Sequence, residues 1–92
     1  MLTFEDLNLP YDIEYTGELY NHWKNLILNA SHIELCLLER FAPGGHIAFR
    51  KDAGLSAFFD KRFFAFGGIT SEMSKKIGFN KLNKVQLNKL LE

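Results

Sequence analysis

Hydrophobic side chains recur at helical spacing in the segment that follows Thr16. Apolar residues fall at i, i+4, i+7, i+8 and i+11 and therefore share one helical face: Leu19, Trp23, Leu26, Ile27 and Ala30. Asparagine and lysine occupy the opposite face. Thr16 can cap the first turn, in which Glu18 lies where the helix dipole favours an acid. The pattern predicts an amphipathic helix over residues 17–29.

The next segment, residues 32–41, fits two periodicities. Its apolar residues alternate with other residues as in a strand: Ile33, Leu35, Leu37 and Phe41. Residues 31–34 also have the form of a capping box, and three of those apolar residues fit helical spacing. The run Ala42-Pro43-Gly44-Gly45 is typical of a reverse turn into residues 46–51, so a strand is the favoured interpretation.

Residues 46–67 present the same ambiguity. One interpretation is a β-meander of strands at 46–51, 55–59 and 62–66, with turns at 52–54 and 60–61. The other is a helix, because five apolar residues also fall at i, i+3, i+4, i+8 and i+11: Leu55, Phe58, Phe59, Phe63 and Phe66. The aromatic content and the turn residues favour strands.

Short elements are predicted at the two ends of the chain. Thr3 can cap a turn over residues 4–7, and residues 11–15 suit a short edge strand. Ser71 can cap a helix that ends at Gly78, and a last helix is expected over about 81–91. The expected fold is α+β in one domain over residues 1–92: an amphipathic helix, an antiparallel β-meander and two short helices. The alternative is an all-α fold.

Composition describes a folded chain without a membrane segment. Hydrophobic residues make up 47 % of the sequence, which is too many for a disordered protein. The first residues are acidic and precede no apolar run, and the longest apolar run is only residues 35–38. Cys36 is the only cysteine, which is typical of a reducing compartment. We therefore expect a soluble cytoplasmic protein with no membrane partner.

Enzymatic chemistry has little support in the sequence. Cys36 lies in the most apolar run, where burial disfavours the thiolate, and the acids are spaced as solvated charge. His32, Cys36 and His46 could approach one another, but they lack the close paired spacing of a zinc site. We expect no enzyme, no metal and no cofactor.

The surplus of phenylalanine between residues 41 and 66 indicates a partner surface. In a meander, adjacent phenylalanines point to opposite faces, so both sheet faces are apolar and one stays uncovered. The expected interface has an aromatic centre, Phe58, Phe63, Phe64 and Phe66, and a basic rim, Arg50, Lys51, Lys61 and Arg62. This predicts a small non-catalytic regulator or inhibitor that binds a protein partner and self-associates.

The alternative function is nucleic-acid binding through the C-terminal segment. Net charge is zero, but residues 1–23 carry five acids and no cation, whereas residues 73–91 carry five lysines and no acid: Lys75, Lys76, Lys81, Lys84 and Lys89. Residues 73–91 also resemble a helix-turn-helix, in which such lysines would contact phosphates. The absence of arginine there disfavours base readout. In the other interpretation, the acidic and basic ends face each other and neutralise.

Overall fold

The computed structural model describes residues 1–10, 13–52 and 54–92, and this part of the chain is helical, with no strand. The expected α+β fold with a β-meander is therefore wrong, and the all-α alternative fits. The elements are α1 (Phe4–Leu7), α2 (Gly17–Asn29), α3 (His32–Phe41), the 3₁₀ turn η1 (Ile47–Phe49), α4 (Leu55–Ala65), α5 (Ser71–Ile77) and α6 (Lys84–Leu91).

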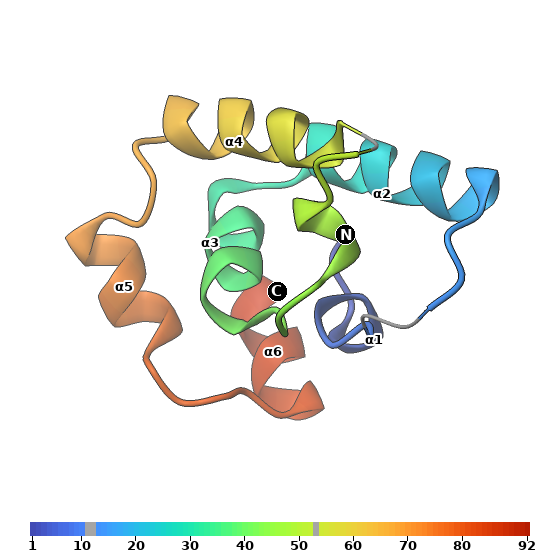
Figure 1. Cartoon of the computed structure of the whole chain (residues 1–92). Helices are drawn as coiled ribbons and strands as arrows, with labels where there is room; N and C mark the ends of the chain where they lie inside the picture. The colour runs from blue at the N-terminus through green and yellow to red at the C-terminus, as the bar shows by residue number, and fades with distance from the viewer. Residues whose placement is uncertain (11–12, 53) are drawn as a thin grey trace.

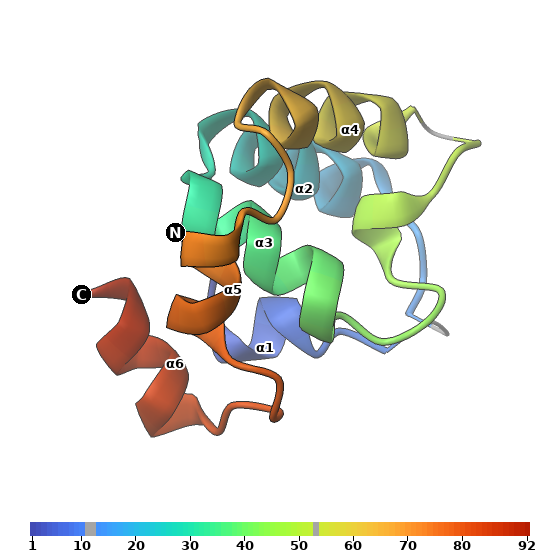
Figure 2. The same cartoon turned by 90° about the vertical axis from the view of Figure 1, so that its left-hand side faces the viewer.

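Helix α3 lies in the middle of the molecule, and the other helices surround it (Figure 1). Helices α2 and α4 lie side by side along one edge in both views (Figures 1 and 2) and pack on each other. Helix α5 packs against α3, and α6 packs against α1. The core consists mainly of side chains from α2, α3 and α4. Leu2 and Leu7 near the N-terminus and Ile77 and Leu87 near the C-terminus are also part of it.

The central position of α3 explains why its sequence fits a strand as well as a helix. Six of its ten residues are buried, so the apolar face is wide and the polar face is reduced to His32, Glu39 and Arg40. The deciding signal is local. The hydroxyl of Ser31 accepts from the amide of Glu34, and the Glu34 carboxylate accepts from the amide of Ser31 in a capping box.

The aromatic segment that we expected to form strands is helix α4. Leu55, Phe59 and Phe63 are buried at i, i+4 and i+8 on one face of the helix, whereas Ala57 and Lys61, which would share that face in a strand, are exposed. The Phe59 ring lies 4.9 Å from the Phe49 ring and 5.3 Å from the Phe63 ring, between centroids. Burial of this stripe outweighs the intrinsic strand preference of phenylalanine.

The other predicted elements have mixed outcomes. The turn at 43–45 exists, with the His46 amide bonded to the Pro43 carbonyl, but it leads into η1 instead of a second strand. The turn predicted over 4–7 is the short helix α1, capped by Thr3 as expected. The helices over 17–29 and 71–77 are confirmed, although Thr70 caps the second of these. The C-terminal helix begins at 84 instead of 81. The predicted edge strand at 11–15 and turn at 52–54 include residues outside the described part of the chain.

His46 fixes the connection between α3 and α4 against the core. Its side chain is buried; Nδ1 accepts from the Ala48 amide at 3.0 Å, and Nε2 donates to the Asp6 carbonyl at 2.7 Å. The ring also packs edge-on against Trp23, with 4.7 Å between centroids. Burial lowers the pKa of His46, which agrees with a neutral ring that accepts at one nitrogen and donates at the other.

Candidate partner-binding groove

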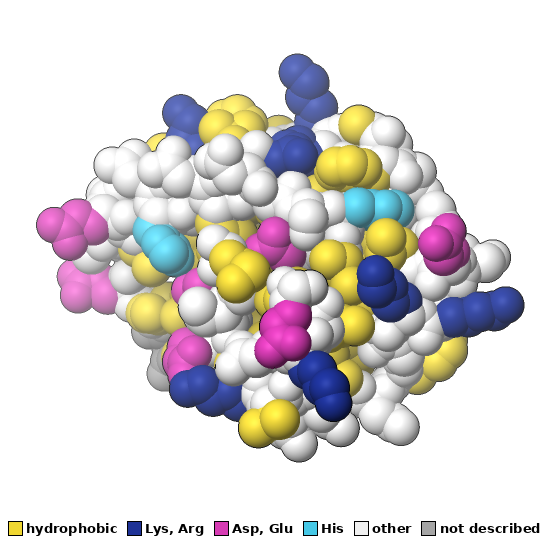
Figure 3. Space-filling view, turned by 180° about the vertical axis from the view of Figure 1, so that it is seen from behind, with side chains coloured by type: hydrophobic (Ala, Val, Ile, Leu, Met, Phe, Trp, Pro, Cys, Tyr) yellow, Lys and Arg dark blue, Asp and Glu magenta, His cyan; other side chains and the backbone are white. Residues whose placement is uncertain are grey.

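An open groove of about 400 Å³ runs between α2 and α4. We call it the α2/α4 groove; its lining is Leu28, Phe58, Lys61, Arg62, Ala65 and Phe66. The α4 members follow helical spacing and form a face distinct from the buried stripe of that helix. Seen from behind, hydrophobic side chains are visible between lysine and arginine side chains along the upper edge, where α2 and α4 lie (Figure 3).

Arg62 joins the two helices that form the groove. Its Nη1 donates to the carbonyl oxygens of Leu28 and, at 3.2 Å, Ile27, in the last turn of α2. That turn carries no basic residue of its own, so the guanidinium caps carbonyl oxygens at the end of the helix and offsets the negative end of the helix dipole. Arg62 is therefore part of the scaffold as well as of the groove wall.

Phe66 lies at one end of the groove, and side chains of α3 and α4 contact its ring. Its ring stacks on His32 at 4.9 Å between centroids and 8° between planes, and the Arg62 guanidinium lies 5.6 Å from its centroid. The His32 Nε2 donates to the Gly68 carbonyl at 2.7 Å. Gly68 has φ of 67° and its amide bonds to the Phe63 carbonyl, so the chain turns sharply away from α4 and leaves Phe66 42 % exposed.

Cations surround the apolar centre of the groove. Lys61 and Arg62 line it, and Lys24 of α2 places its ammonium 5.5 Å from the centroid of the Phe58 ring. The described residues that line the groove include no acid. The groove therefore combines an apolar floor with a positive rim.

The structure brings together half of the interface residues expected from the sequence: Phe58, Lys61, Arg62 and Phe66. Phe63 is a core residue, and Phe64 is 68 % exposed but does not line the groove. Arg50 and Lys51 precede α4, at the end opposite Phe66. Arg50 pairs with Asp52 at 2.7 Å, and its guanidinium lies 4.4 Å from the Tyr15 ring centroid.

Two residues of the groove were not predicted: Leu28 and Ala65. The signal at Leu28 was present, because it is an apolar residue on the otherwise polar face of the predicted helix, and it is 42 % exposed. No sequence pattern marks Ala65 as a residue of the groove. Its place in the groove depends on α4 being a helix packed on α2.

The described residues form no sheet of the kind that motivated self-association. Phe59 and Phe63 are buried within the helical core, and Phe49 and Phe58 are half-buried. The large aromatic side chains of α4 and its C-terminal cap that stay exposed are Phe64 and Phe66.

The two oppositely charged ends of the chain approach each other. Lys84 of α6 donates to Glu5 of α1 at 3.1 Å, so part of the charge sorting is compensated within the fold. The remaining four lysines of the segment are exposed: Lys75, Lys76, Lys81 and Lys89. The linker between α5 and α6 spans 78–83, longer than the turn of about 3–4 residues in a helix-turn-helix.

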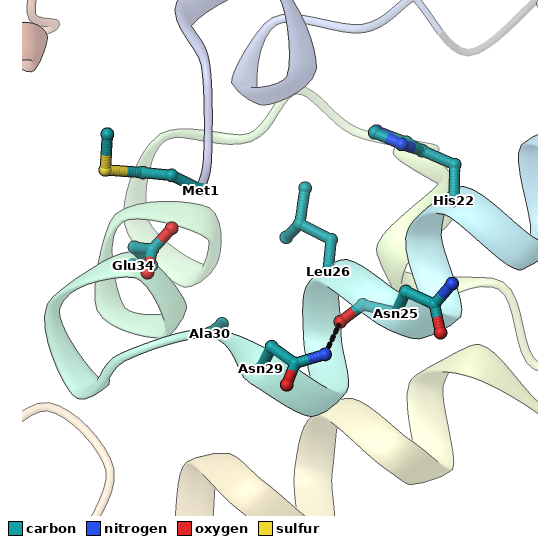
Figure 4. Close-up of a pocket in the computed structure, with 7 residues that line it drawn as sticks. All are labelled: Met1, His22, Asn25, Leu26, Asn29, Ala30 and Glu34. Carbon is teal, nitrogen blue, oxygen red and sulfur yellow. Dashed lines mark hydrogen bonds between the residues drawn. The ribbon is translucent and has the colours of Figure 1, made fainter.

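A smaller hollow of about 290 Å³ lies between α2 and the start of α3, lined by Met1, His22, Asn25, Leu26, Asn29, Ala30 and Glu34 (Figure 4). The Glu34 carboxylate accepts from the Ser31 amide and hydroxyl, both at 3.0 Å, and from the Leu2 amide at 2.6 Å. Glu34 thereby caps α3 and ties the N-terminal segment to it. These contacts explain the buried carboxylate without a ligand.

The three candidate metal ligands have other partners. His32 and the Cys36 thiol both approach the Gly68 carbonyl, whereas His46 bonds to residues 6 and 48. Burial raises the pKa of Cys36, which disfavours the thiolate. Within residues 1–10, 13–52 and 54–92, no group of three or more histidine, cysteine or acidic side chains is placed to hold a metal ion. None of the helices in this part of the chain has the length and apolar character of a membrane span.

Comparisons with known proteins identify no relative: no protein family, curated protein or solved structure matches this chain.

Proposed function

We propose that this protein is a non-catalytic interaction module, and that the α2/α4 groove binds an amphipathic helix of a protein partner with acidic residues along its flanks. The observation that carries the proposal is the coincidence, in one groove, of exposed apolar side chains and a rim that is only positive. Bound in this way, the protein regulates or inhibits its partner by covering part of the partner's surface.

The shape of the groove supports a helix as the ligand. Its walls are two packed helices, and such grooves accept apolar anchors spaced at i, i+3 or i+4, and i+7. Its volume of about 400 Å³ has room for a few anchoring side chains. Phe58 and Phe66 present aromatic surface for those anchors, and aromatic residues are common at interface centres.

The charge of the rim supports acidic flanks on that helix. Lys61 is exposed and free to meet a carboxylate, and Lys24 lies beside the Phe58 ring. Opposite charge across an interface speeds association and fixes the orientation of the partner more than it adds affinity. The lining residues include no serine, cysteine, histidine or carboxylate, which supports binding instead of catalysis.

Selection from a displayed library of random peptides tests this proposal. We expect the wild-type protein to enrich peptides with helical apolar spacing and flanking acids. Ala65→Glu should abolish capture of those peptides, because it fills the groove and repels the acids. Ala57→Glu is the matched control, since Ala57 is also an exposed alanine of α4 but does not line the groove. It should bind as wild type does.

A third variant separates the effect of the added charge from the effect of filling the groove. Ala65→Lys also fills the groove but attracts acids, so it should retain more binding than Ala65→Glu. Enriched peptides without acids, or equal capture by the two glutamate variants, would contradict the proposal. If light scattering shows that the wild-type protein dimerises and Ala65→Glu does not, the groove binds a second copy of this chain instead of a helix from another protein.

A further inference from the structure

A second hollow of about 560 Å³ lies where the end of α3 meets α5 and the linker that follows it. Its lining is Arg40, Ile69, Thr70, Ser71, Ser74, Lys75 and Phe79, none of which belongs to the α2/α4 groove. Three of these side chains are hydroxyls, two are cations and one is a large aromatic ring. The hollow therefore offers hydrogen-bond donors and positive charge next to an aromatic surface.

The ring of Phe79 contacts Arg40 at the edge of this hollow. The Arg40 guanidinium lies 4.3 Å from the centroid of the Phe79 ring, within range of a cation–π contact. Phe79 is nevertheless 79 % exposed. The face of the ring that Arg40 does not cover can stack on another planar group.

Arg40 is itself immobilised by the adjacent helix. Its Nη1 donates to the carbonyl oxygens of Gly78 at 2.9 Å and Ser74 at 3.3 Å, and its Nη2 donates to the Ser74 hydroxyl at 3.0 Å. These bonds cap the C-terminal end of α5 and set the direction of the linker that carries Phe79. The stacking surface is thus organised before any ligand arrives.

The charges around the ring favour an anionic ligand. Lys75 lines the hollow and is exposed, and Lys76 and Lys81 are exposed on either side of Phe79 in the sequence. None of the acids of these two helices lines the hollow: Glu39 on α3 and Glu72 on α5 are exposed, and Glu34 is buried in the first turn of α3. A ligand that carries both a planar ring and a negative charge fits this combination.

We infer that this hollow binds single-stranded nucleic acid, with a base stacked on Phe79 and a neighbouring phosphate on Lys75. Aromatic side chains and a positive groove are what such binding requires, whatever the base sequence. A duplex fits less well, since its bases are stacked on each other and the long linker between α5 and α6 does not form a helix-turn-helix. An acidic peptide has charge but lacks the planar ring.

Fluorescence anisotropy with labelled oligothymidine and oligouridine of about fifteen nucleotides tests the inference. At low salt, about 50 mM, we expect binding that weakens as salt rises. Phe79→Ala should weaken binding about tenfold, whereas Phe79→Trp should retain it. Val85→Ala is the control, because Val85 is an apolar residue of α6 that is 74 % exposed. Lys75→Gln should reduce the slope of log affinity against log salt by about 0.7.

Three results would overturn the inference. The first is no binding of either oligonucleotide at low salt by the folded wild-type protein. The second is an equal loss for Phe79→Ala and Val85→Ala, which would show that the ring is not the stacking surface. The third is displacement of the oligonucleotide by polyglutamate as effectively as by the same unlabelled oligonucleotide, because the hollow would then be a site for acidic polymers in general.

Discussion

Replacing Phe59 with alanine is expected to lower the free energy of unfolding by about 3–5 kcal/mol, the usual range for a buried phenylalanine. Phe59 is fully buried in the middle of α4, between the rings of Phe49 and Phe63. The truncation removes apolar contacts on both sides and leaves a cavity that the surrounding helices can close only in part. Urea unfolding followed by circular dichroism measures the loss.

Phe64→Ala is the matched control on the same helix. Phe64 is 68 % exposed, so its truncation is expected to change stability by about 0.5 kcal/mol or less, the usual limit for surface substitutions. The pair tests which face of α4 is buried in the core. Similar losses for the two variants would contradict the burial pattern of α4.

Replacing Glu34 with alanine is expected to lower the free energy of unfolding by about 2–3 kcal/mol. Glu34→Ala breaks the capping box of α3 and leaves the Leu2 amide without its acceptor. Loss of a cap typically costs about 1 kcal/mol, and an unsatisfied buried donor about 1–3 kcal/mol. The control is Glu39→Ala, an exposed glutamate of the same helix. Equal losses for both variants would show that the capping contacts carry little stability.

The contribution of Glu34 also depends on pH in a defined direction. Burial raises the pKa of Glu34, but hydrogen bonds from Ser31 and Leu2 outweigh it and hold the pKa below the ordinary value of 4.5. A lowered folded-state pKa gives stability that is full above pH 4.5 and is lost as the pH falls through that pKa. The stability difference between wild type and Glu34→Gln should therefore shrink below pH 4.5. A difference independent of pH would contradict this assignment.

Sequence patterns predicted the elements with a one-sided apolar stripe or a clear cap. Helix α2 has both, and its bounds of 17–29 are those predicted. Six of the ten residues of α3 are buried, so its polar side is narrow and its apolar pattern fits a strand as well. In α4 the phenylalanines occupy the groove face and the exposed face as well as the core, which hides the helical stripe of Leu55, Phe59 and Phe63.

The sequence predicted the kinds of side chain that form the candidate site, but not the full set of residues. Aromatic residues next to lysine and arginine indicated an interface, and four of the expected residues do meet in the α2/α4 groove. The other wall of the groove comes from α2, about 30 residues earlier in the chain, and only the tertiary packing brings it there. The bonds from Arg62 to the end of α2 have the same origin.

The most direct measurement of the proposed function is a nuclear magnetic resonance titration of the ¹⁵N-labelled protein with the acidic helical peptide that the library selects. We expect the largest shifts in amide resonances in the last turns of α2 and along α4, near Leu28, Lys61 and Phe66, and we expect Ala65→Glu to remove them. Dominant shifts in α5 and α6 that persist in Ala65→Glu would contradict the proposed function.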